Sequence, residues 1–157
     1  MKIHIERRRG RHLGADYGGG EGHHVTGFAA QRTILVVEDD PTMVDILHIL
    51  LEDSGCRILS TSRGRDAIDL VRSERPDVVT LDLGLPDMDG REVLRELHPD
   101  PSWSGPSVIV VTARHFAPQA ADRVTAVLSK PFDAAEFERV ILSALESAES
   151  GNRAGLP

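Results

Sequence analysis

The chain has 157 residues, of which 40% are hydrophobic and 27% are charged, and its formal net charge at pH 7 is −7. This composition is typical of a globular domain, and the negative charge argues against nucleic acid as the main partner of the folded part. Since no apolar run is long enough to span a membrane and Cys56 is the only cysteine, we expect a cytoplasmic protein without disulfides.

Residues 1–31 differ in composition from the rest of the chain. They are rich in glycine, carry four arginines between Arg7 and Arg11, and show little periodic apolar pattern. They contain basic residues but no apolar segment of the kind that a secretory signal requires. We therefore predict a flexible extension over residues 1–31, one folded domain over residues 32–148, and a flexible tail over residues 149–157.

From Thr33 onward, short apolar runs alternate with segments of helical periodicity. The first run, Ile34 to Val37, is followed by the acidic residues 38–40 and by Pro41, which suits the first turn of a helix that ends before Gly55. Further strands are predicted over residues 57–61, 77–81, 107–112 and 124–128. Further helices are predicted over residues 64–73, 89–97 (with Asp89 as its N-cap) and 133–148, and the short polar segment 116–123 could form a fourth helix between the last two.

This alternation predicts βαβ units around a parallel sheet, in which ligands bind beyond the carboxyl ends of the strands. The polar residues that interrupt the apolar runs all follow or end a strand. Glu38 and Asp39 follow the first strand, Asp82 the third, Thr112 ends the fourth, and Lys130 follows the fifth. We therefore expect these side chains to meet at one edge of the sheet.

Three carboxylates that converge in a partly buried site repel one another, so a positive group has to neutralise them. A hard divalent cation with oxygen ligands fits this set, and Mg²⁺ is favoured. Lys130 adds a second positive group, and Thr112 adds a hydroxyl that can bond an oxyanion. Together these groups predict a site that accepts a phosphoryl group on Asp82.

Four motifs in this order, ILVVEDDPTM, VVTLDLGLPDMDG, VIVVTA and LSKPF, resemble those of the receiver domain of two-component response regulators. The resemblance covers residues 33 to about 147. It implies an α/β, flavodoxin-like fold, with a single doubly wound, five-stranded parallel sheet in the order 2-1-3-4-5.

The resemblance also implies a role for each site residue. Asp82 is the expected phosphoacceptor, Thr112 and Lys130 are the expected catalytic partners, and a cis peptide bond is expected between Lys130 and Pro131. The expected Mg²⁺ ligands are Asp39 directly, Glu38 through water, Asp82, and the backbone carbonyl of Gly84.

The chain departs from the family pattern in two ways. Val127 occupies a position that is usually aromatic, and the segment between Thr112 and Lys130 is about four residues shorter than in the family. We therefore expect a short or irregular fourth helix and an unconventional signalling route. Arg114 and Gly84 flank the expected path of hydrolytic water, so we predict that Arg114 slows the loss of the phosphoryl group.

The expected function is that of a stand-alone receiver, which takes a phosphoryl group from a histidine kinase or a phosphotransfer protein and signals to an unidentified partner by contact. It is expected to catalyse only its own phosphorylation and slow dephosphorylation, without a DNA-binding domain or a membrane, and a homodimer is left open. The alternatives are a phosphorelay intermediate and a phosphorylation-independent interaction or dimerisation module. A haloacid-dehalogenase-like phosphohydrolase is disfavoured, because Gly84 stands where that pattern needs a second Asp.

Overall fold

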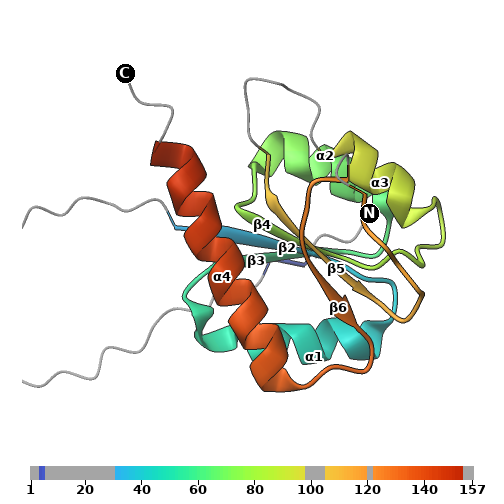
Figure 1. Ribbon diagram of the computed structural model, residues 1–157, viewed down its shortest axis with the longest axis horizontal. Helices are drawn as coiled ribbons and strands as arrows, with labels where there is room; N and C mark the ends of the chain where they lie inside the picture. Colours follow the sequence, from blue (N-terminus) through green and yellow to red (C-terminus); the bar gives the residue numbers. More distant parts are fainter. Residues whose placement is uncertain (1–3, 6–30, 98–104, 120–121, 154–157) are drawn as a thin grey trace, which may run out of the picture.

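A computed structural model describes residues 4–5, 31–97, 105–119 and 122–153. A central sheet is covered by helices on both faces (Figure 1). Its five parallel strands lie in the order β3-β2-β4-β5-β6, which is the predicted order 2-1-3-4-5. The strands are β1 His4–Ile5, β2 Thr33–Val37, β3 Arg57–Thr61, β4 Val78–Leu81, β5 Ser107–Thr112 and β6 Val124–Ser129.

The described helices begin and end at residues that the sequence marks. They are α1 Pro41–Leu51, η1 Glu52–Ser54, α2 Gly64–Glu74, α3 Gly90–Glu96 and α4 Ala134–Arg153. The Asp40 carboxylate caps α1 by accepting a hydrogen bond from the Thr42 amide, and Pro41 occupies the first turn. Helix α1 passes into the short 3₁₀ turn η1, and Gly55 ends it with a positive φ of 69°. No helix among the described residues is both long and apolar enough to cross a membrane.

Two apolar cores lie on opposite faces of the sheet. Helices α2 and α3 cover one face, where Val71 and Leu94 pack against Leu35 and Val79 of the strands. Helices α1 and α4 cover the other face, where Leu47 and Phe137 belong to a second cluster. Figure 1 shows the same division, with α2 and α3 on one side of the sheet and α1 and α4 on the other. Side chains on both faces explain why the central strands are continuous apolar runs rather than alternating ones.

The structure differs from the sequence-based expectations at three places. His4–Ile5 form a sixth strand, antiparallel to β3, within the extension that we expected to be flexible. The rest of that extension, apart from Gln31, lies outside the described residues. Helix α4 continues to Arg153, beyond the predicted end at Ala148. Residues 154–157 of the predicted tail also lie outside the described residues.

The third difference concerns residues 116–123, which could have formed a short or irregular fourth helix. Residues 116–119 and 122–123, which are the described part of this segment, contain no α-helix, so the described part of the connection between β5 and β6 is irregular, as the short spacing indicated. Phe116 is buried in the core beneath α3, and the Arg91 guanidinium lies 4.8 Å from the centre of its ring. Pro118 follows closely and disfavours the helical backbone conformation at the preceding Ala117. The buried Phe116 and Pro118 together oppose a regular helix here.

Candidate functional site

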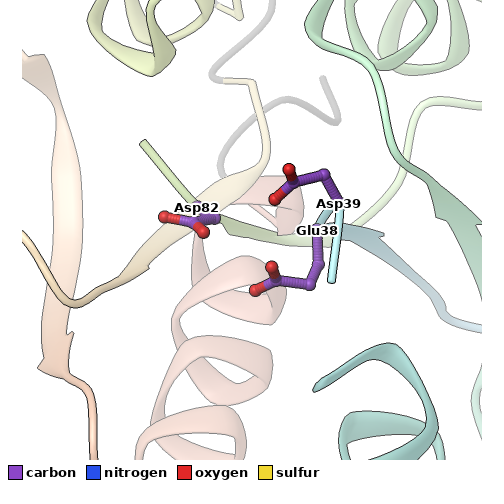
Figure 2. A group of neighbouring side chains, drawn as sticks. All are labelled: Glu38, Asp39 and Asp82. Carbon is purple, nitrogen blue, oxygen red and sulfur yellow. The ribbon is translucent and has the colours of Figure 1, made fainter. Parts of the chain in front are cut away.

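The three predicted acidic residues meet at the carboxyl edge of the sheet. Glu38 and Asp39 follow β2, and Asp82 follows the adjacent strand β4. The Asp82 amide donates to the Val37 carbonyl (2.9 Å), which fixes the register of the two strand ends. One carboxylate oxygen from each acidic residue lies within 4.8 Å of the others. Figure 2 shows the three side chains beside one another at the strand ends, with the carboxylates of Glu38 and Asp39 extending toward Asp82.

Lys130, which follows the edge strand β6, adds a positive charge to this group of carboxylates. Its amide donates to the Thr112 carbonyl (2.9 Å) of the intervening strand β5. Its Nζ lies 2.6 Å from Glu38 Oε2 and 3.2 Å from Asp82 Oδ2. The structure therefore brings together the carboxylates and the lysine that the sequence placed at separate strand ends. The expected cis peptide bond between Lys130 and Pro131 is confirmed.

Burial controls the electrostatics of this group. The side chain of Glu38 is only 2% exposed, and this burial raises the pKa of Glu38, although hydrogen bonds from Lys130 and from the Asp40 amide partly offset the effect. Burial alone would lower the pKa of Lys130, but the hydrogen bond and charge of Glu38 and the charge of Asp82 outweigh it and raise that pKa. Lys130 therefore remains an ammonium ion at neutral pH.

One ammonium ion does not balance three carboxylates. Asp39 is exposed, Asp82 is partly exposed and Glu38 is buried, so the oxygens form a cluster that is open on one side. Carboxylate oxygens at this spacing are suitable ligands for a hard divalent cation that keeps several waters. The donor set therefore fits Mg²⁺, with Glu38, Asp39 and Asp82 as the residues that would hold it.

Backbone and loop contacts orient the Asp82 side chain. The Gly84 amide donates to Asp82 Oδ1 (3.1 Å), so each Asp82 oxygen has a separate donor, one from Gly84 and one from Lys130. Helix α3 starts close to this loop, because a Cβ at Gly90 would lie only 2.5 Å from Leu83 Cα and 3.0 Å from the Asp82 carbonyl oxygen. Only glycine allows this close approach. The use of the Gly84 carbonyl as a metal ligand stays a prediction.

Thr112 and Arg114 border the site on the β5 side. Thr112 is 1% exposed, and its hydroxyl accepts a hydrogen bond from the Arg114 amide (3.1 Å). The exposed Arg114 side chain extends toward Gly84, with Nε 3.7 Å from the position that a Cβ on Gly84 would occupy. Arg114 and Gly84, the two residues expected to flank the path of hydrolytic water, therefore lie next to each other.

Asp87 is a positioning residue that the sequence analysis missed. Its Oδ1 accepts from the Gly64 amide (2.8 Å) and its Oδ2 accepts from the Arg65 amide (3.1 Å), so it caps α2 from the loop that follows Asp82. The predicted cap Asp89 instead accepts from the Arg91 amide at the start of α3. Asp89 follows the local capping pattern, whereas the partners of Asp87 lie more than 20 residues away and leave no local signal.

Val127 occupies the β6 position that is usually aromatic in the family, and from this difference we expected an unconventional signalling route. It is partly buried and packs against the core cluster that contains Phe116. The aromatic member of that cluster is Phe116, which comes from the irregular connection before β6 and not from β6 itself.

Comparison with known proteins agrees with the geometry. A model of the response regulator receiver domain family matches residues 34–142. Protein PilH of Pseudomonas aeruginosa is 33% identical over 125 residues, which is 75% of this chain and 98% of PilH. The polar-differentiation response regulator DivK of Brucella anthropi is 32% identical over 123 residues, which is 74% of this chain and 98% of DivK.

Solved structures show the same fold. The signal receiver domain of a putative Luxo repressor protein from Vibrio parahaemolyticus superposes with a TM-score of 0.73 and 26% identity, covering 81% of this chain and 99% of that chain. The receiver domain of a sensor histidine kinase from Pseudomonas aeruginosa has a TM-score of 0.65 and 26% identity, covering 74% of this chain and 99% of that chain. That structure has a magnesium ion coordinated in its active-site cleft.

Proposed function

This chain belongs to the response regulator receiver domain family, and from that premise we propose that it is a stand-alone receiver that accepts a phosphoryl group on Asp82. The donor is a histidine kinase or a histidine phosphotransfer protein in the cytoplasm, and the phosphorylated protein signals to its partner by contact. PilH and DivK, which this chain covers almost completely, support the stand-alone arrangement.

One observation carries the proposal. Lys130, which follows β6, places its Nζ between Glu38 Oε2 after β2 and Asp82 Oδ2 after β4, although two buried or half-buried carboxylates at this spacing oppose folding. A purely structural edge of a sheet does not need this arrangement. A site that has to neutralise the charge of an incoming phosphoryl group does need it.

The residues of the chain then divide the chemistry. A carboxylate oxygen of Asp82 forms a bond to phosphorus while the P–N bond of the phosphohistidine breaks, and the electron pair of that bond stays on the imidazole nitrogen. Lys130 offsets the negative charge on the phosphoryl oxygens, and the Thr112 hydroxyl donates a hydrogen bond to one of them. Glu38 and Asp39 supply carboxylate oxygens that would hold Mg²⁺, which when bound neutralises the carboxylates and the phosphoryl oxygens.

The chain turns over no external substrate in this proposal. Its catalysis is limited to its own phosphorylation and to slow hydrolysis of the acyl phosphate. Slow hydrolysis suits a signal carrier, because the phosphorylated state has to persist until the partner is met.

Incubation with acetyl phosphate and Mg²⁺, followed by intact-mass measurement, tests the proposal. We expect the wild type to gain the mass of one phosphoryl group, and the gain to disappear in Asp82→Asn and when a chelator removes the metal. Asp45→Asn, which changes an exposed carboxylate of α1 outside the acidic cluster, is the matched control and should still be phosphorylated. Failure of the wild type to react with acetyl phosphate, phosphoramidate or a phosphotransfer protein would leave only an interaction module with this fold.

A further inference from the structure

Strand β3 forms an outer edge of the parallel sheet, and its backbone groups alternate between two sides. The Arg57 amide donates to the Arg32 carbonyl (2.7 Å), and the Thr61 carbonyl accepts from the Glu38 amide (3.0 Å). Residues 57, 59 and 61 therefore point their backbone groups toward β2. Because strand residues alternate, Ile58 and Ser60 point theirs away from β2, to the open edge. Such an edge is a template for pairing with another strand.

The edge is occupied by β1. His4 lies opposite Ser60 and Ile5 lies opposite Leu59 in an antiparallel pairing. Since the backbone groups of Ser60 face β1, His4 and Ser60 form the pair that exchanges hydrogen bonds. The amide of Ile5 then faces the other way, away from β3. The pairing with β3 therefore uses the backbone amide of His4 but not that of Ile5.

The chain geometry favours docking within one molecule. Strand β1 runs toward the end of β3 at which β2 begins, because Ile5 lies opposite Leu59 and Thr33 lies opposite Arg57. The end of β1 at Ile5 and the start of β2 at Thr33 are two residues apart along the strands and two strands apart across the sheet. These separations correspond to about 7 Å and about 10 Å. Residues 6–32 cover this span with a contour length of several times the distance, at about 3.3 Å per residue. A tether this close gives the edge a high local concentration of β1.

Charge points to the same occupant. Residues 1–31 carry five basic and three acidic residues, whereas residues 32–157 carry 13 basic and 22 acidic residues. A basic segment that follows β1 is therefore attracted to its own acidic domain, while two copies of that domain repel each other.

We propose that the outer edge of β3 is a strand-docking surface whose occupant is the chain's own strand β1, His4–Ile5, bound within the same molecule. Main-chain hydrogen bonds hold this segment by strand addition. Its presence keeps the β3 edge from pairing with a second copy or with another extended chain. No residue of β3 belongs to the group of three carboxylates or contributes a side chain that contacts Lys130.

Amide hydrogen exchange measured by NMR on the full chain tests the proposal, with two proline variants as a matched pair. His4→Pro removes the amide that faces Ser60, whereas Ile5→Pro removes an amide that faces away from β3. We expect the Ser60 amide to exchange about tenfold faster in His4→Pro than in the wild type, and to change much less in Ile5→Pro. The Leu59 amide faces β2 and should keep its rate in all three proteins.

Two results would overturn the proposal. Equal Ser60 exchange in the wild type and in His4→Pro, with Leu59 unchanged, would mean that β1 does not occupy the edge. A loss of Ser60 protection on dilution of the wild type would mean that the occupant comes from a second copy. Protection that is independent of concentration, together with the difference between the two variants, supports docking within the molecule.

Discussion

Lys130 holds two carboxylates close together that would otherwise repel each other. Replacement by Met removes the positive charge and leaves the buried Glu38 without its 2.6 Å partner. We expect Lys130→Met to lower the free energy of unfolding by about 2–4 kcal/mol without metal, toward the lower end because Lys130 retains 15% exposure. Urea unfolding in a chelator measures this change.

Lys130→Arg keeps the charge and serves as the control. Mg²⁺ should stabilise Lys130→Met more than the wild type, because the cation no longer meets the repulsion of the ammonium. An unfolding free energy equal to that of the wild type in the chelator would show that Lys130 contributes little to the metal-free fold.

Arg114 extends its guanidinium toward Gly84 at the open side of the site. There it limits the approach of water to a phosphorylated Asp82. We expect Arg114→Ala to lose the phosphoryl group roughly three to ten times faster, which corresponds to about 0.6–1.4 kcal/mol in the barrier. The decay of the phosphorylated mass after removal of acetyl phosphate measures the rate. His115→Ala changes an exposed neighbour and is the control, and an unchanged rate in Arg114→Ala would remove this role.

At the residue scale, the sequence predicted the acidic cluster because polar residues at the ends of buried strands have few alternatives to meeting at one edge. Glu38, Asp82 and Lys130 interrupt or follow apolar runs, and these interruptions can be recognised in the amino-acid sequence. Asp87 was missed because its partners, Gly64 and Arg65, are brought to it only by the packing of α2 against the loop after β4.

At the scale of elements, Asp87 links the loop after Asp82 to the start of α2. Burial alone would raise the pKa of Asp87, but the amides of Arg65 and Gly64 outweigh it and lower that pKa below 3.8. The folded state therefore binds the proton more weakly than the unfolded state. The stabilisation is fully present above pH 3.8 and is lost as the pH falls through the lower pKa of the folded state.

We expect Asp87→Ala to lower the free energy of unfolding by about 1–2 kcal/mol at pH 7, in line with the loss of a helix cap. Asp87→Asn keeps one acceptor oxygen and should retain part of this stability, without the pH dependence. Urea unfolding at pH 7 and at pH 3 measures both effects. A difference between the wild type and Asp87→Ala that stays constant or grows toward low pH would contradict the capping role.

The strands and helices of the sheet were predictable because β-branched runs and helical periodicity agree with the layers that they form. The elements that differ are those whose state depends on tertiary contacts. Strand β1 has only two residues and is paired because the edge of β3 is available to it. The segment around Phe116 and Pro118 has a composition that allows a helix, but the ring is drawn into the core beneath α3. No local sequence pattern predicts the pairing of β1 with β3 or the burial of Phe116 beneath α3.

At the scale of the whole molecule, the negative charge of the chain complicates any test of a metal site. The net charge is −7, so added salt stabilises the fold by screening, whether or not a specific site exists. A specific site adds a second effect, because a ligand that binds only the folded state stabilises it by mass action. The two effects are separated by comparing salts at equal ionic strength.

We expect MgCl2 at about ten times its dissociation constant to add about 1.4 kcal/mol beyond the effect of NaCl at the same ionic strength. For a domain of this size that corresponds to an increase in Tm of roughly 3–6 °C, measured by circular dichroism. Asp39→Asn is the variant to compare, because Asp39 is exposed and its loss removes a predicted ligand without opening the core. The additional gain should largely disappear in this variant, while the response to NaCl remains. Equal responses of the wild type to the two salts would mean that the three carboxylates do not form a Mg²⁺ site, and Lys130 alone would then have to neutralise Asp82.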